Sequence, residues 1–426
     1  MIAHMSYGKT GLELVLSDDG RIRTLWAREQ RALDDPLQAT REALARPIES
    51  PPLAQIARGR RDACVVVSDI TRPVPHRDIL PPLLDTLEGC GIAAEKITIL
   101  IATGIHRPNE GAELIELLGE GIASRCRCVN HYSRREGECR FIGQTRCGIP
   151  VFVNQRYLDA DLKILTGLIE PHFWAGFSGG RKAILPGICS LETMKHMHGA
   201  AMIEACMANY GRLEGNLFHE AGLEVARMAG VDFILNVTVD EKKRPTGVFA
   251  GHYDAAHRAG ARLCEAGAGF ELDEPADLAI VSGGGYPLDK TFYQAAKPIT
   301  VAWLALRKGG RSLILTECSE GLGSAPFVEL LDMARSPQHL LELLRKPGFF
   351  QVDQWCAQTM AQMLLDNRIA VYCSGAAPER LRRYGYEPVA DPQAWVDSQL
   401  ERLGPQARVL VIPDGPYVYA RVGRRT

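Results

Sequence analysis

The sequence has no long hydrophobic run and almost no net charge. Its 49 Lys and Arg residues nearly balance its 51 Asp and Glu residues, which gives a formal net charge of −2 at pH 7. So small a charge creates no field that would attract nucleic acid or an anionic membrane. No apolar stretch reaches the roughly 18 residues of a membrane span, and the opening residues, MIAHMSYGKT, lack the apolar run of a signal peptide. We therefore expect no nucleic-acid partner, no membrane partner and a cytoplasmic location.

The sequence also lacks the paired cysteine motifs that bind structural zinc. The chain has 12 cysteines, and none of them form the CxxC pairs that are typical of zinc ribbons. One loose cluster contains Cys126, Cys128, Cys139 and Cys147, but its spacing places no ligand pair on a tight turn. Buried free thiols explain this cluster better than structural zinc does.

Two nucleotide-binding signatures are incomplete. The glycine run at 283–285 follows an apolar stretch, but Tyr286 and Pro287 come next, so the G-x-G-x-x-G spacing of a dinucleotide site is absent. A second glycine-rich loop ends in Lys182, but Arg181 and Ala183 occupy the positions where a P-loop has Gly and Ser or Thr. Neither loop therefore identifies a standard nucleotide fold.

Short buried runs alternate with helical stretches over most of the chain. This alternation predicts an α/β fold with two domains, each built on a mostly parallel sheet. We expect an N-terminal domain over 1–270 and a C-terminal domain over 271–402. The sequence leaves open whether 403–426, with a last strand at 407–412, joins the first domain. The predicted strands lie at 63–67, 97–101, 162–165, 233–239, 278–281, 312–315 and 369–372.

The stretch from 170 to 199, EPHFWAGFSGGRKAILPGICSLETMKHMHG, gathers several kinds of chemical group. It follows the predicted strand at 162–165, and ligands bind at the carboxyl ends of strands in open α/β sheets. Its glycines let a backbone approach a ligand closely, and Ser178 and Lys182 stand beside them. The alternative is a tight turn with two solvated basic residues.

Polar side chains also follow the other predicted strands. Two histidines from different strands suit two-base proton transfer near neutral pH, and an arginine suits a carboxylate because its guanidinium can hold both oxygens. A single histidine is more often a hydrogen-bonded structural residue, but several such loops at one sheet edge favour a site. The side chains are Asp69, Arg72, Thr103, His106, Glu170, His172, Asp289, Gln294 and Lys297.

Five motifs, taken together and in order, resemble the nickel-dependent lactate racemase family. They are DITRP at 69–73, GIHR at 104–107, EPH at 170–172, GFSGGRK at 176–182 and YQAAK at 293–297. The resemblance covers residues 60 to 375. It implies two α/β domains with the active site in the cleft between them. It also implies a nickel-pincer nucleotide, a pyridinium mononucleotide that holds nickel through sulfur, carbon and sulfur, carried by the N-terminal domain.

The resemblance assigns the cofactor and the metal to particular residues. Lys182 is similar to the lysine that forms a thioamide link to the cofactor. His198, sixteen residues later, is similar to the fourth nickel ligand, and imidazole suits nickel. His196 is the competitor, but helix positions two apart point to different faces, so both cannot easily reach one metal. The loop residues expected at the cofactor are Thr103, Gly104, Ser178, Gly179 and Gly180.

The implied activity is inversion of C2 in a 2-hydroxy acid through a 2-keto acid. His106 and His172 resemble the acid–base pair, and Asp69 resembles a carboxylate that orients its neighbours. Arg72 and Lys297 resemble the residues that hold the carboxylate and the developing oxyanion. The expected partners are a small 2-hydroxy acid and the proteins that synthesise the cofactor. The expected substrate-pocket residues are Trp174, Tyr293, Gln294 and Trp355.

Two residues depart from the pattern of lactate enzymes. Trp174 is bulkier than the aliphatic residue expected there, and Cys356 stands where a polar amide is familiar. We therefore expect that lactate is not the best substrate, and malate and other short or functionalised 2-hydroxy acids stay open. A nicotinamide-dependent 2-hydroxyacid oxidoreductase and a non-catalytic nickel or nucleotide carrier are the alternatives. The missing dinucleotide spacing disfavours the first, and the pair of histidines disfavours the second.

Overall fold

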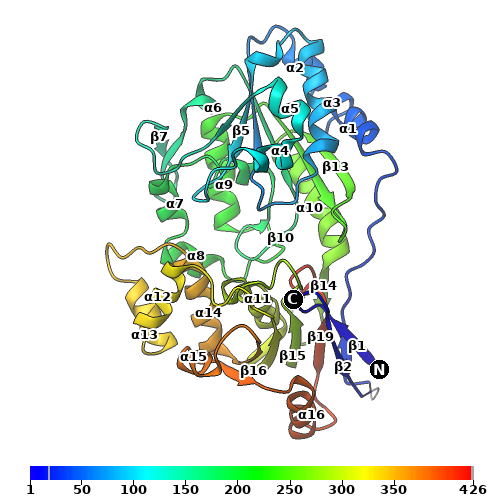
Figure 1. The fold of residues 1–426 in the computed structure, drawn as a ribbon, viewed down its shortest axis with the longest axis vertical. Helices are drawn as coiled ribbons and strands as arrows, with labels where there is room; N and C mark the ends of the chain where they lie inside the picture. Colours follow the sequence, from blue (N-terminus) through cyan, green and yellow to red (C-terminus); the bar gives the residue numbers. More distant parts are fainter. Residues whose placement is uncertain (18–19, 424–426) are drawn as a thin grey trace. The chain divides into compact units, whose positions relative to one another are not determined.

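The fold contains two six-stranded sheets with helices between their strands (Figure 1). This computed structural model describes residues 1–17 and 20–423. One sheet is entirely parallel and the other has a single antiparallel strand at its edge. The predicted α/β class, with two mostly parallel sheets, is therefore confirmed. None of the helices in these two ranges is long and apolar enough to cross a bilayer.

The described residues group into two compact units, each organised around one sheet. Unit A contains 29–198 and 212–266, and unit B contains the described parts of 1–28, 199–211 and 267–426. This grouping differs from the predicted single cut near residue 270. Two segments from the predicted N-terminal domain, 1–28 and 199–211, belong to unit B. Each unit is therefore assembled from separate stretches of the chain.

The sheet of unit A places β4 at its centre, because the chain adds β5 and β6 on one side and then β9 and β12 on the other. Such a reversal is the switch point at which open α/β sheets bind ligands. The strands in sheet order are β13 (Pro245–Gly251), β12 (Phe233–Val239), β9 (Leu162–Leu168), β4 (Ala63–Ser68), β5 (Ile97–Ala102) and β6 (Arg127–Asn130). Two antiparallel pairs lie outside it, β7 (Cys139–Gln144) with β8 (Pro150–Asn154) and β10 (Pro171–His172) with β11 (Gly176–Phe177).

The apolar runs of unit A are buried from both faces, as parallel strands require. The first five residues of β4 are all buried, and so are most of those in β5 and β9. Helix α3 (His76–Gly89) adds Ile79, Leu83 and Leu87 to the same core at helical spacing. The other helices of this unit are α1 (Pro36–Ala45), α2 (Leu53–Ala57), η1 (Ala94–Lys96), α4 (Ala112–Leu118), α5 (Glu120–Arg125), α6 (Gln155–Asp159), η2 (Gly180–Ala183), α7 (Leu191–Met197), α9 (Leu217–Ala229) and α10 (Ala255–Ala268).

The sheet of unit B joins the first and last parts of the chain. Strand β19 (Val409–Ile412), whose domain the sequence left open, pairs with β15 on one side and with β3 on the other. Figure 1 shows the blue N-terminal strands beside this red strand. The sheet order is β18 (Glu387–Val389), β17 (Arg368–Tyr372), β16 (Leu306–Leu315), β15 (Ala276–Ser282), β19 and β3 (Ile22–Thr24).

The remaining elements of unit B surround this sheet. Helix α11 (Ala296–Ala305) is almost wholly buried and packs against β15 and β16. Strands β1 (Ile2–Met5) and β2 (Leu12–Val15) form an antiparallel pair, and β14 (Gly269–Leu272) pairs in parallel with β20 (Tyr419–Val422). The other helices are α8 (Ala200–Cys206), η3 (Phe292–Ala295), α12 (Ala325–Met333), α13 (Pro337–Leu344), α14 (Gln354–Asp366), α15 (Pro378–Arg383) and α16 (Pro392–Leu403).

Candidate active site

The candidate site residues of unit A follow three neighbouring strands, β4, β5 and β9. Asp69 and Arg72 come after β4, His106 comes after β5, and the segment from His172 to Lys182 comes after β9. Their loops therefore lie at the carboxyl edge of the sheet, at its switch point. Lys297 and Gln294 follow β15 in the other sheet. The expectation that all of these loops leave one sheet is wrong, because the chain divides them between two.

His106 is held by a buried carboxylate. Its Nδ1 lies 2.6 Å from Oδ2 of Asp69, which is only 3% exposed, while about half of the His106 side chain is exposed. The other carboxylate oxygen accepts hydrogen bonds from the hydroxyl and backbone N–H of Thr71. Burial alone would raise the pKa of Asp69, but the hydrogen bond and charge of His106, with Thr71 and Arg72, lower it. Because an ionised Asp69 accepts the Nδ1 hydrogen, Nε2 of His106 carries the lone pair of a base.

His172 is held in the opposite way. Its Nδ1 accepts backbone N–H groups of Trp174 (3.3 Å) and Ala175 (3.2 Å). An Nδ1 that accepts hydrogen bonds carries no hydrogen, so the neutral ring is protonated at Nε2. This Nε2 lies 3.4 Å from Nζ of Lys182. The tautomers of His106 and His172, assigned from these partners, are therefore opposite.

The surroundings of Lys182 favour its uncharged amine. Burial, and after it the charges of Arg181 and Arg72, lower its pKa to about 7 against the opposing effect of Glu170. Its ammonium group also lies over the ring of Phe218, 5.2 Å from the centroid. A lysine whose pKa is near 7 has a large fraction of free amine at neutral pH, and only the free amine is a nucleophile.

The glycine loop before Lys182 is tied to the protein itself. Asn236 accepts the N–H of Gly180 (2.7 Å), and a Cβ added at Gly179 would lie 2.8 Å from the same amide oxygen. The Ser178 hydroxyl donates to Leu168 O at 2.7 Å and accepts the N–H of Glu170 at 2.9 Å. Both glycines adopt positive φ values, which other residues adopt only with strain. The roles of Ser178, Gly179 and Gly180 at the cofactor stay predictions, and these contacts give the three residues a structural part.

A buried arginine joins the Lys182 segment to the turn that holds His172. Arg181 is 1% exposed, donates from Nη2 to Ala175 O (2.6 Å), and places Nη1 2.8 Å from Nε2 of His257. Added Cβ atoms would lie 2.9 Å from the His257 ring at Gly180 and 2.7 Å from Arg181 Cγ at Gly222, so both glycines make room for this pair. Burial and then the Arg181 charge hold the pKa of His257 well below its ordinary value.

The sequence did not single out Arg181, His257 or Asn236 for these roles. Arg181 stands inside the GGRK motif, beside the lysine that drew the prediction. His257 and Asn236 come from α10 and β12, and no local pattern links them to the loop. Only the folded structure, which brings these three side chains to the glycine loop, shows that they support it.

His198 and His196 differ in their surroundings. His198 follows α7 directly, is 6% exposed, and has Nδ1 3.3 Å from Met194 O. That contact leaves Nε2 as the nitrogen with the lone pair. Burial lowers the pKa of His198 to about 3, with Lys182 adding to the effect, so the ring is neutral. His196 is about half exposed and faces Glu192 at 3.4 Å. The buried, neutral imidazole is the better candidate metal ligand.

Trp174 packs against both of these candidate groups. Its ring lies edge-on to His172, with centroids 5.8 Å apart, and edge-on to His198 at 5.9 Å. Asn216 fixes the backbone of Trp174 by donating to its carbonyl oxygen at 2.8 Å. The side chain is 4% exposed. It therefore forms part of the wall between the candidate acid–base group and the candidate metal ligand.

Thr103 and Gly104 also use their polar groups within the protein. The Thr103 hydroxyl donates to His131 O at 2.5 Å, and the N–H of Gly104 donates to Gly187 O at 3.0 Å. The first contact joins the loop after β5 to the residue after β6, and the second joins it to the segment after Lys182. Their predicted contact with the cofactor stays a prediction.

The predicted residues of unit B gather at two helix starts. Tyr293 and Gln294 lie in η3, and Lys297 lies in the first turn of α11. Trp355, at the start of α14, donates from Nε1 to the Tyr293 hydroxyl at 3.1 Å. Cys356 also contacts that hydroxyl, and burial raises the pKa of its thiol to about 12. The structure thus brings these residues together within their own unit.

The remaining sequence signals have structural explanations. Gly285 lies in a turn that packs closely on the segment around Gly8. A Cβ added at Gly285 would lie 3.2 Å from Gly8 O. Cys126 is buried, but Cys147 is exposed, so the expectation of buried thiols is wrong for Cys147. Within 1–17 and 20–423, no three His, Cys, Asp or Glu side chains are grouped to hold a metal by themselves.

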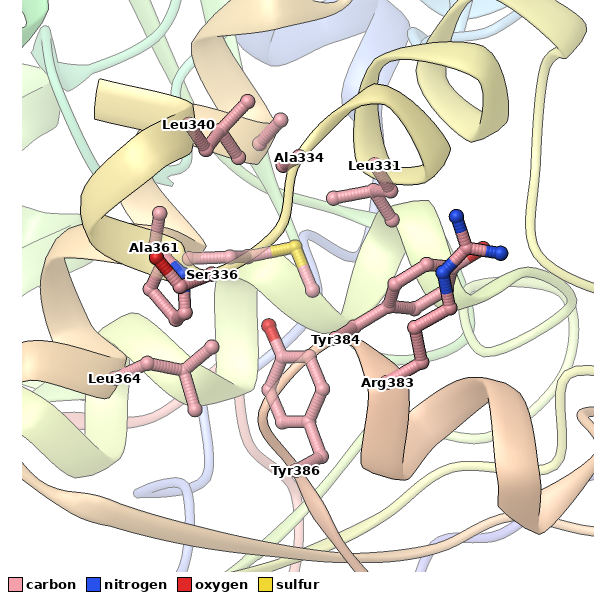
Figure 2. Close-up of a pocket in the computed structure, with 12 residues that line it drawn as sticks. Leu331, Ala334, Ser336, Leu340, Ala361, Leu364, Arg383, Tyr384 and Tyr386 are labelled. Carbon is pink, nitrogen blue, oxygen red and sulfur yellow. The ribbon is translucent and has the colours of Figure 1, made fainter. Parts of the chain in front are cut away.

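A cavity in unit B is too small to be a substrate site. It lies among α12, α13 and α14 and measures about 20 Å³, which suits roughly one water molecule. Figure 2 shows its lining, which includes Leu331, Leu340, Leu364, Tyr384 and Tyr386. None of the predicted site residues lines it.

Comparison with known proteins identifies the family. The chain matches the lactate racemase N-terminal domain over residues 7–210 and the lactate racemase C-terminal domain over residues 272–419. A lactate racemase from Thermoanaerobacterium thermosaccharolyticum is 33% identical over 420 residues, which cover 97% of this chain and 98% of that protein. A lactate racemase from Lactiplantibacillus plantarum is 36% identical over 384 residues, 89% of each protein.

Solved structures agree with these matches. The lactate racemase apoprotein from Thermoanaerobacterium thermosaccharolyticum has a TM-score of 0.91 at 33% identity, covering 99% of this chain and 100% of that one. A Thermotoga maritima structure at 18% identity, covering 91% and 99%, has a TM-score of 0.66 and supports the fold alone. The α/β fold and these relatives define a homologue of isomerases. The chain belongs to the lactate racemase family, which confirms the resemblance found in the sequence.

Proposed function

We propose that the protein is a racemase or epimerase that inverts C2 of a 2-hydroxy acid, with a nickel-pincer nucleotide as its cofactor. The observation that carries the proposal is the pair of histidines with opposite Nδ1 partners, a carboxylate at His106 and backbone N–H groups at His172. A reaction that removes and returns a hydroxyl proton needs one nitrogen that accepts a proton and another that donates one.

The residues present fit the proposed cofactor. Lys182 offers an amine with a large uncharged fraction near pH 7, and such an amine can be joined covalently to an acyl-type carbon. His198 offers a neutral buried imidazole whose Nδ1 contacts Met194 O, which leaves Nε2 for a metal. A pincer with three donors of its own needs only one further ligand from the protein. Lys182 and His198 would therefore hold the group.

The chain's own residues handle the substrate and its protons. The bound group would supply the acceptor and donor for the hydride at C2. Arg72, an exposed guanidinium that donates to the carbonyl and hydroxyl oxygens of Thr71, would bind the substrate carboxylate. His106 would accept the hydroxyl proton at Nε2, and Asp69 would stabilise the resulting imidazolium.

His172 would act on the other face of the 2-keto acid. After the keto acid has turned, its oxygen would meet the Nε2–H of His172, which polarises a carbonyl as a neutral imidazole can. The Nε2–H of His172 would stay on the ring and stabilise this oxygen, and a proton from solvent would complete the hydroxyl group of the inverted product. His106 would release its proton to solvent, to which about half of its side chain is open.

The proposed substrate class rests on a carboxylate-binding arginine and on an altered wall. Arg72 is the group of unit A that is expected to hold a 2-hydroxy carboxylate. Trp174 lies against both His172 and His198, so it would reshape the space next to the reacting carbon. We therefore propose that the third substituent of the preferred substrate differs from the methyl group of lactate.

The test is a chiral-chromatography panel on holoprotein, produced together with the proteins that synthesise the cofactor. Single enantiomers of lactate, malate and longer or aromatic 2-hydroxy acids are incubated, and the opposite enantiomer is measured. We expect inversion of several acids, with the 2-keto acid only transient. Full nickel and cofactor content with no inversion of any acid would favour a carrier. Net oxidation that requires nicotinamide would favour the oxidoreductase.

A further inference from the structure

Two cysteines outside the candidate active site meet at the ends of neighbouring strands in unit B. Strands β16 and β17 are parallel, with Leu315 opposite Tyr372. Cys373 follows β17 directly, and Cys318 follows β16 by three residues. The N–H of Thr316 donates to Tyr372 O at 3.1 Å, so the two chains remain together beyond the strand ends.

The loops that carry the two thiols are in close contact. Glu317 O accepts the N–H of Gly375 at 2.9 Å and lies 3.7 Å from Sγ of Cys373. A Cβ added at Gly375 would lie only 1.7 Å from Cys318 O, so glycine alone allows this approach. Cys318 and Cys373 lie in these two adjoining loops, and their thiols are close enough for each to shift the pKa of the other.

The two thiols are chemically unequal. Cys318 is 0% exposed and φ there is +56°, a left-handed conformation that is unusual for a residue with a side chain. Cys373 is only partly buried. The hydrogen bond from Cys318 lowers the pKa of the Cys373 thiol, burial opposes it, and the backbone N–H groups of Gly375 and Ala376 add to the lowering. The hydrogen bond to Cys373 and then burial raise the pKa of Cys318.

We propose that Cys373 is a site of reversible oxidation by peroxide, with Cys318 as its resolving thiol. An accessible thiolate beside a second thiol is the arrangement of redox-sensitive cysteines. The Cys373 thiolate attacks one oxygen of hydrogen peroxide, which breaks the O–O bond and gives a sulfenic acid and hydroxide. The Cys318 sulfur then attacks the sulfenic sulfur, its proton leaves with the displaced hydroxyl as water, and a disulfide forms. A dithiol such as dithiothreitol reduces it again.

The bridge would join segments that are far apart in sequence. It would close a loop of roughly 55 residues, so it should stabilise the protein by restricting the unfolded chain. Neither Cys318 nor Cys373 is a candidate catalytic or cofactor-binding residue, so this proposal does not rest on the proposed function.

The experiment uses the full-length chain purified in the reduced state and exposed to equimolar hydrogen peroxide, followed by alkylation of the remaining thiols. We expect the intact mass to show the loss of two hydrogens and a non-reducing peptide map to join Cys318 to Cys373. Dithiothreitol should restore both free thiols. The exposed Cys147, whose sulfur lies 3.2 Å from the Thr145 hydroxyl, is the internal comparison. Modification of Cys147 before any bridging of Cys373 would overturn the proposal.

Two variants separate the roles of the thiols. Cys373→Ser should abolish the bridge and leave Cys318 reduced. Cys318→Ser should leave a sulfenic acid at Cys373 that a dimedone reagent traps, since no resolving thiol remains. Cys147→Ser, the matched control, should form the bridge at the wild-type rate. The oxidised wild type should also melt several degrees above the reduced protein. A Cys318→Ser protein with no dimedone adduct at Cys373 would contradict the assignment.

Discussion

The two sides of the candidate site in unit A differ in charge and exposure. On one side, Asp69, Arg72 and His106 form an ionic group, with the arginine and the histidine open to solvent. On the other side, burial is the chief cause that lowers the pKa of Lys182 to about 7 and that of His198 to about 3, so His198 is neutral at pH 7 and Lys182 has a large fraction of free amine. His172 faces the second group through its contact with Lys182.

This difference separates two chemical tasks. Binding an anionic substrate and moving its proton call for charges that remain in contact with water. Holding a metal and forming a covalent bond call for a lone pair, which a proton would occupy. The same fold provides both, because one loop stays at the surface and the other is buried under α9 and α10.

Removal of Lys182 should abolish the cofactor and nickel binding that we propose for the buried side. We expect Lys182→Ala to lose both the covalently added mass and the bound nickel, and with them all measurable inversion. Intact mass spectrometry with metal analysis gives both readouts. A variant that kept the covalent adduct would show that another residue is the attachment point.

The apoprotein offers a control for this prediction. An amine must lose its proton before it can be acylated, so Lys182 should react with an acylating reagent increasingly as the pH rises through about 7. Peptide mapping across a pH series measures this. If half-maximal acylation occurred instead near the ordinary pKa of lysine, Lys182 would lack the lowered pKa on which the comparison of the two sides depends.

His196, within α7, and His198, directly after it, should differ in their effect on nickel retention. His198→Ala should weaken nickel retention strongly, because it removes a buried neutral imidazole. His196→Ala, the matched control on the solvent side, should remain near wild type. Nickel content after dialysis against a chelator measures both, and the reverse ranking would exchange their assignments.

Each acid–base histidine should matter on its own. Loss of one general base typically lowers the rate by about 10²–10⁴-fold, so His106→Ala and His172→Ala should each lose that much with nickel still bound. The kcat of holoprotein in each direction is the measurement. Activity within threefold of wild type would exclude that histidine as an acid or base.

Asp69→Asn should have a smaller effect, confined to one side. The amide keeps the shape but cannot stabilise a protonated His106, so we expect a decrease of about 10–100-fold. The variant should retain its full content of nickel and cofactor, since the buried side is unchanged. Loss of the cofactor in Asp69→Asn would show that the two sides are not independent.

The smallest change should come from Trp174→Leu. A hydrophobic wall discriminates between related substituents by about 1–3 kcal/mol, so the order of preferred 2-hydroxy acids should shift without loss of activity. The kcat/KM values for lactate, malate and aromatic analogues measure this. An unchanged order, with lactate far ahead in both proteins, would remove Trp174 from substrate selection.

Much of the fold could be predicted because parallel strands are buried on both faces. The runs at 63–67 and 97–101 are almost wholly apolar, the run at 233–239 alternates, and each forms a strand. Strand β3 was missed, because Ile22–Thr24 is short and its pattern shows no run. Its partner β19 lies hundreds of residues away, and pairing at that distance leaves no local trace.

The site was predicted as far as its chemistry follows local motifs. His106, His172 and Lys182 stand in short segments whose residue types suit their tasks. The opposite tautomers could not be predicted, because they depend on which neighbour meets each Nδ1. The same holds for Arg181, whose partners Ala175 and His257 come from a turn and from α10.

The pairing of β3 with β19 also sets an order of events during translation. Unit A is complete once the ribosome has passed the end of α10 at Ala268, so it can fold while the rest of the chain is being made. Strands β1 and β2 can pair with each other early, but β3 finds its partner only after Ile412 has emerged. Strand β3 therefore remains unpaired through most of synthesis, and unit B is the last part of the protein to form.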